Sequence, residues 1–101
     1  MDVFFLRLSA PRPDFAASMT DAERAIMDRH SEYWEPYLES GRVVVQGPTV
    51  DETGTWGLTV VEADDEEALR EFIAGDPAVT AGLAEWTVGK MIHGYVRSAS
   101  S

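Results

Sequence analysis

The feature that most constrains the fold is a long helical segment with its own start signal, set between two β-rich segments. Residues 20–23 read Thr-Asp-Ala-Glu, a capping box in which the hydroxyl and the last carboxylate each bind an amide at a helix start. Gly41 is a typical helix end, so the sequence predicts a helix over residues 20–40. Pro36 lies inside this helix, and because its ring clashes with the preceding turn we expect a kink or a restart there.

A second helix with its own start signal follows later in the chain. Asp64 and Glu67 repeat the capping pattern, and Gly75 marks the predicted end of the helix. Pro77 is expected to begin one further short turn through residues 81–82.

Four β-rich segments surround these helices. The first leads into a predicted loop over residues 9–19, where Pro11 and Pro13 disfavour both a helix and a strand ladder. A turn is predicted over residues 49–54. The predicted strands cover residues 2–8, 43–45, 56–62 and 85–95. The second of these is expected to end at residues 46–48.

The resulting order is strand, helix, strand, strand, helix, strand, which predicts an α+β fold of the ferredoxin-like type. Right-handed crossovers place both helices on one face of a four-stranded antiparallel sheet. The opposite face keeps apolar residues such as Val3 and Phe5. An open apolar face on so small a domain is most readily buried against a second copy, so the pattern predicts a homodimer.

Composition restricts the classes of function. The 101 residues correspond to one domain, predicted over residues 1–97, with a disordered polar tail at 98–101. The formal net charge is −10, and such a surface repels phosphate backbones, so we expect no nucleic-acid binding. No apolar run is long enough to span a bilayer and no cysteine is present, so we expect a cytoplasmic protein without membrane association.

His30 is the strongest candidate for chemistry. It lies on the apolar stripe of the first predicted helix, with Ile26, either Tyr33 or Trp34, and Tyr37 at three- and four-residue steps. An unpaired buried polar group costs roughly 1–3 kcal/mol, so this imidazole needs a partner. Asp76, in the sharp break after the second helix, is the most suggestive carboxylate, and the topology allows contact without requiring it. A paired carboxylate would orient the ring, select its tautomer and favour its charged form, which makes a simple proton-transfer device.

The surroundings of this pair can be interpreted in two ways. Trp34, Tyr37 and Trp56 could wall a pocket for a small organic ligand. The same aromatic residues are also typical of a plain core, and a histidine on an apolar helix face is often a satisfied core residue. An aspartate before proline is commonly a turn or capping device. His93 is expected at the surface or at an interface.

Other sites find little support in the sequence. His30 with one carboxylate provides too few ligands for a catalytic zinc, and the acidic run at residues 64–67 lacks the spacing of a calcium loop. Neither a phosphate-binding glycine loop nor a G-x-S-x-G element is present. We therefore expect no metal and no cofactor.

Several segments together resemble the YCII-related (YciI-like) family over nearly the whole chain. The resemblance rests on the order and spacing of residues 27–34, 38–48, 56–58, 60–63 and 75–79. It implies a dimeric ferredoxin-like fold related to the dimeric α/β-barrel proteins, and an active site built on a histidine and an aspartate. Matched by motif, these are His30 and Asp76. A few members resemble cofactor-free enzymes for small molecules, including dehydrochlorination of hydroxylated aromatics.

Two hypotheses follow. In the first, His30 is a general acid or base oriented by Asp76, in an elimination or isomerisation of a small aromatic or carbonyl compound. In the second, the pair is structural and the chain is a non-enzymatic dimeric module that binds a small ligand or a protein. The two differ in exposure, because a catalytic pair must line an open pocket whereas a structural pair can be sealed.

Overall fold

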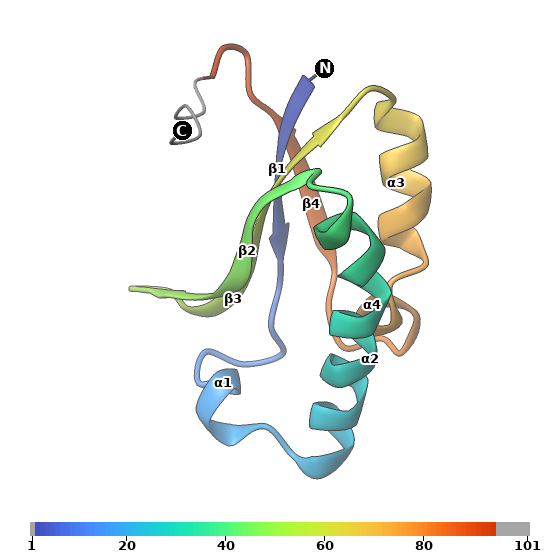
Figure 1. Ribbon diagram of the computed structural model, residues 1–101. Helices are drawn as coiled ribbons and strands as arrows, with labels where there is room; N and C mark the ends of the chain where they lie inside the picture. The colour runs from blue at the N-terminus through green and yellow to red at the C-terminus, as the bar shows by residue number, and fades with distance from the viewer. Residues whose placement is uncertain (1, 95–101) are drawn as a thin grey trace, which may run out of the picture.

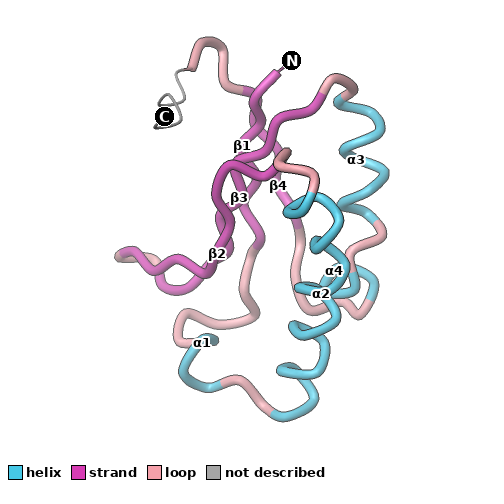
Figure 2. Tube along the Cα trace, viewed as in Figure 1, coloured by secondary structure: helices cyan, strands magenta, loops and turns pink. Residues whose placement is uncertain are grey.

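The computed structural model describes residues 2–94, which form one antiparallel sheet with helices packed on it (Figure 1). The strands follow the order β2-β3-β1-β4, and every neighbouring pair is antiparallel. The predicted ferredoxin-like α+β fold is thus confirmed. The elements are β1 Asp2–Leu8, α1 Phe15–Ser18, α2 Asp21–Glu39, β2 Val43–Asp51, β3 Gly54–Ala63, α3 Glu66–Ala74, α4 Pro77–Thr80 and β4 Trp86–Lys90 (Figure 2).

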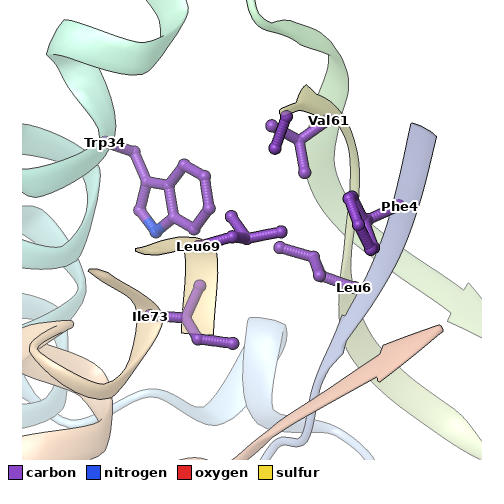
Figure 3. Close-up of a cluster of buried hydrophobic side chains, with 7 residues drawn as sticks. Phe4, Leu6, Trp34, Val61, Leu69 and Ile73 are labelled. Carbon is purple, nitrogen blue, oxygen red and sulfur yellow. The ribbon is translucent and has the colours of Figure 1, made fainter. Parts of the chain in front are cut away.

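The helices α2, α3 and α4 cover one face of the sheet (Figure 1). Burial along β1 alternates, so that Phe4, Leu6 and Leu8 face the helices while the residues between them are exposed or partly exposed. In the largest cluster, side chains from the sheet meet side chains from α2 and α3 (Figure 3). Its buried members are Phe4, Leu6, Trp34, Val61, Ala63, Leu69 and Ile73.

The opposite face of the sheet carries no described helix and keeps apolar side chains at its surface. Phe5 is 46% exposed and Val45 is 53% exposed. The strand register places Phe5 opposite Val60 on β3 and opposite Gly89 on β4. This is the face that the apolar pattern of the sequence predicts to be covered by a second copy.

The long helix α2 begins as predicted. The Glu23 amide donates to the Thr20 hydroxyl at 3.1 Å, and the Thr20 amide donates to the Glu23 carboxylate at 2.9 Å. The expected restart at Pro36 does not occur, since α2 runs without interruption to Glu39. Pro36 lies in the last turn, where it lacks the amide that would donate to the Glu32 carbonyl, but its own carbonyl still accepts from the Ser40 amide at 3.0 Å.

The hairpin between β2 and β3 is longer than predicted, and the turn predicted over residues 49–54 is wrong in extent. Both strands continue into that range, leaving a turn of Glu52 and Thr53. β2 is an edge strand, which tolerates Pro48 because an edge position can lack a backbone donor. The Asp51 carboxylate accepts from the Thr53 amide at 2.8 Å and so fixes the tight turn.

Three other boundaries differ from the predictions. Asp65, rather than Asp64, caps α3, because Asp65 is extended and accepts from the amides of Glu67 and Ala68. The predicted loop over residues 9–19 contains the short helix α1. The last strand ends at Lys90, while Tyr95 and the predicted tail at 98–101 lie outside the described residues.

Candidate active site

The structure brings His30 and Asp76 into direct contact. His30 lies in α2, and Asp76 lies between α3 and α4. The ring atom Nδ1 of His30 is 2.9 Å from Oδ1 and 2.7 Å from Oδ2 of Asp76. A carboxylate only accepts, so Nδ1 carries a proton and donates it to Asp76. In the neutral ring Nε2 is then the acceptor nitrogen.

Asp76 is sealed from solvent, with an exposed fraction of 0%. Besides the His30 ring, the carboxylate accepts from the Trp34 indole at 2.8 Å and from the Ala78 amide at 2.9 Å. Burial by itself raises the pKa of this carboxyl, but the three donors outweigh burial and hold the pKa below its usual 3.8. Asp76 is therefore a fixed anion that orients the ring.

The backbone before Asp76 is held by a hydrogen bond from α2. The Tyr33 hydroxyl donates to the Phe72 carbonyl at 2.8 Å, at the end of α3. The same carbonyl accepts from the Gly75 amide at 3.1 Å. A Cβ atom at Gly75 would lie only 2.6 Å from the Tyr33 hydroxyl oxygen. Glycine thus leaves room for the Tyr33 hydroxyl, and a larger residue at position 75 would force this contact to shift next to Asp76.

His30 is accessible where Asp76 is not. The His30 side chain is 13% exposed and lines a cavity of about 340 Å³. Within the described part of the chain Nδ1 is engaged by Asp76, and Nε2 has no hydrogen-bond partner. The Trp86 ring lies 6.2 Å from the His30 ring, measured between centroids, and forms part of the same wall. One ring nitrogen is therefore fixed by a sealed anion, and the other has no partner among the described residues, on a side chain that lines the cavity.

The cavity lies between the sheet, α2 and the segment that follows β1. Its lining is mainly apolar, with Leu8 from the sheet, Met27 from α2 and Phe15 from α1. Hydroxyl and amide groups are interspersed. The complete lining is Leu8, Ser9, Ala10, Pro11, Phe15, Ala16, Met19, Met27, His30, Ser31, Gln46, Gly47, Pro48, Thr55, Trp56, Gly57, Leu58, Thr59, Leu83, Ala84 and Trp86.

Of the three aromatic residues predicted to wall the pocket, the structure places Trp56 in its lining and Trp34 and Tyr37 elsewhere. Trp34 is a fully buried member of the cluster in Figure 3, and its indole donates to Asp76. Tyr37 packs against the same cluster. His93 lies at an exposed position after β4.

Most residues of the cavity wall were not predicted from the sequence. Met27, one turn before His30 on α2, had a signal in the helical period. Gln46 and Thr59 had none, because facing the cavity depends on the register between β2 and β3, which pairs them directly.

No group of three or more His, Cys, Asp or Glu side chains in residues 2–94 is arranged to hold a metal ion. Among the helices that the structure describes, none combines the length and apolar character needed to cross a membrane.

Comparison with known proteins defines the family. The model of the YCII-related domain matches residues 3–92, so the chain belongs to the YCII-related family. Among solved structures, the chain is similar to a 5-chloro-2-hydroxyhydroquinone dehydrochlorinase from Burkholderia phenoliruptrix in complex with 2,5-dihydroxybenzoquinone. The two share 24% sequence identity with a TM-score of 0.66, over 90% of this chain and 95% of the other. A search of curated proteins finds no match.

Proposed function

We propose that this protein is a cofactor-free enzyme in which His30 transfers a proton to or from a small ring compound held in the cavity. The observation that carries the proposal is the different environment of the two ring nitrogens of His30. Nδ1 is fixed by the buried Asp76, while Nε2 has no partner among the described residues and His30 lines a mainly apolar cavity. A structural pair would not need the His30 side chain to line a cavity.

The proposed reaction is an elimination or an isomerisation. In an elimination, Nε2 accepts a proton from the substrate, and a halide leaves with the electron pair of its carbon bond. The electron pair released by the departing proton forms the new double bond, so the products are the unsaturated compound, a halide ion and an imidazolium. Asp76 stabilises the imidazolium through its hydrogen bonds at 2.7 and 2.9 Å.

The similar dehydrochlorinase supports this choice of reaction and of substrate size. That enzyme is named for 5-chloro-2-hydroxyhydroquinone, a single ring, and its structure holds another single-ring compound. A cavity of about 340 Å³ accommodates one such ring.

We also propose that the working form is a homodimer. The support is the apolar sheet face, where Phe5 and Val45 are each about half exposed and no described helix covers them. A second copy is the simplest occupant of such a face, because the same patch on both chains can pair with itself.

The test is the release of chloride from 5-chloro-2-hydroxyhydroquinone by wild-type protein and by His30→Gln. Glutamine keeps a donor for Asp76 but cannot take up a proton, so turnover is expected to fall by about 10²–10⁴-fold. His93→Gln is the matched control and should retain full turnover. If wild-type protein releases no chloride, or if His30→Gln releases it as fast, the proposed reaction is wrong. Binding of the compound without turnover would favour the non-enzymatic ligand-binding module.

A further inference from the structure

A polar pair on the sheet wall of the cavity has no role in the proton transfer. Gln46 on β2 and Thr59 on β3 are register partners, and both line the cavity that contains His30. The Gln46 side-chain amide donates to the Thr59 hydroxyl oxygen at 2.9 Å. Thr59 is 1% exposed, so the group that holds the amide is itself fixed in the core.

This hydrogen bond leaves an acceptor available. The NH₂ group of Gln46 is directed to Thr59, and within residues 2–94 the amide oxygen of Gln46 has no hydrogen-bond partner. An amide oxygen accepts hydrogen bonds and donates none. It therefore suits a ligand group that carries a hydrogen, such as a hydroxyl, and gains nothing from a methyl ether.

The charges around the cavity restrict the ligand further. Its lining contains no Asp, Glu, Lys or Arg among the described residues. Neither nearby arginine is itself part of the lining: Arg7 stacks on the ring of the lining residue Trp56 at 4.2 Å, and Arg12 is paired with Glu23 at 2.6 Å. A carboxylate buried here would lack an arginine or lysine partner, and burial of an unpaired charge is strongly unfavourable. The net charge of −10 adds a general repulsion of anions.

We propose that Gln46, held in place by Thr59, determines specificity by accepting a ligand hydroxyl, and that the cavity selects uncharged hydroxylated rings over carboxylated ones. This inference rests on the proposed function, because it assigns the ligand of the same cavity. Gln46 binds one hydroxyl at the sheet wall while His30 meets the reacting part of the ring from α2. Both contacts come from regular elements, and so their separation is fixed by the fold.

The test uses three probes: hydroquinone, its dimethyl ether, in which both hydroxyls are methylated, and gentisate, which is hydroquinone with a ring carboxylate. Affinities are measured without turnover, from amide shifts in two-dimensional NMR under anaerobic conditions. Wild-type protein should bind hydroquinone at least about tenfold more tightly than either other probe, as expected when a hydroxyl meets an unpaired acceptor and a carboxylate meets no arginine or lysine.

Variants at Gln46 isolate its contribution. Gln46→Met keeps the length of the side chain and removes the acceptor, so the preference for hydroquinone over its ether should fall by about tenfold. Gln46→Glu restores an acceptor oxygen and should restore that preference, while gentisate binds still more weakly. Thr59→Val frees the amide and should reduce the preference without altering the size of the cavity.

The inference is overturned if gentisate binds as tightly as hydroquinone, if hydroquinone does not bind, or if Gln46→Met leaves the ratio unchanged. These results are independent of chemistry at His30. Binding that depends on Gln46 without chloride release would refute the proposed reaction alone. Chloride release with an unchanged probe ratio in Gln46→Met would refute the role of Gln46 alone.

Discussion

The contact between Tyr33 and Gly75 predicts an unusual pattern of stability in a pair of variants. Gly75 has φ −90° and ψ 0°, a conformation open to alanine, so the backbone itself does not require glycine. Alanine would even stabilise by about 0.4–1 kcal/mol, because it restricts the unfolded chain. The obstacle is space, since the new Cβ would lie 2.6 Å from the Tyr33 hydroxyl oxygen.

The magnitudes follow from this geometry. Gly75→Ala should destabilise the fold by about 1–3 kcal/mol, the usual cost of forcing an extra carbon into a packed site. Tyr33→Phe removes one hydrogen bond, worth about 0.5–1.5 kcal/mol, and the Phe72 carbonyl keeps its bond from the Gly75 amide. Without the hydroxyl, the nearest ring atom, Cζ of residue 33, is 3.5 Å from the new Cβ, an ordinary contact.

The double variant should therefore be more stable than Gly75→Ala alone, although it carries one more substitution. Urea unfolding of the four proteins measures this, with an expected coupling energy of about 1–2 kcal/mol. Because Asp76 follows Gly75, turnover should fall in Gly75→Ala and recover in the double variant. If the two effects on the free energy of unfolding simply add, the contact does not determine where Asp76 emerges, and this account of the site is wrong.

Further predictions follow from the charges and from the sheet face. Asp76→Asn should lower turnover by at least tenfold. The folded pKa of Asp76 lies below 3.8, so the stability that this carboxylate gives the fold is present above pH 3.8 and is lost as the pH falls through the folded pKa. Asp76→Asn should therefore reduce the loss of stability in acid, measured by unfolding at a series of pH values. The side-chain hydrogen bond from Arg12 lowers the pKa of Glu23 from 4.5 to about 2. Ionised Glu23 therefore stabilises the wild-type fold above pH 4.5, and this stabilisation is lost as the pH falls from 4.5 to about 2. Glu23→Gln should lack this pH-dependent stabilisation, again measured by unfolding. Phe5→Glu should convert the proposed dimer to a monomer, measured by analytical ultracentrifugation. The control variant Glu85→Gln lies outside the strands and should leave the dimer unchanged. A wild-type monomer at micromolar concentration would contradict the proposed dimer.

The order of elements was predictable because each has a local signal. The capping box at residues 20–23 and the alternation along β1 depend only on neighbouring residues, and both are found in the structure. The errors fall where tertiary context decides. Pro48 looks like the end of a strand, but the position of β2 at the edge of the sheet lets the strand continue through it.

The candidate pair was predictable for a related reason. His30 on an apolar helix face needs a polar partner, and Asp76 stands alone in a break between helices. The walls of the cavity were not predictable in the same way. Helical spacing puts Trp34 on the same side of α2 as His30, but only packing shows that its indole reaches Asp76. Residues 9–19 supply several lining side chains without any periodic pattern.

The central claim is that Nε2 of His30 is the atom that meets the ligand while Nδ1 stays bonded to Asp76. The most direct measurement is a long-range ¹H–¹⁵N correlation spectrum of the His30 ring, recorded with and without hydroquinone. The account predicts that the Nε2 resonance moves on binding, while Nδ1 keeps the signature of a protonated nitrogen held by a carboxylate. If hydroquinone binds and Nε2 does not respond, or if Nδ1 loses its proton instead, the ring does not work as proposed.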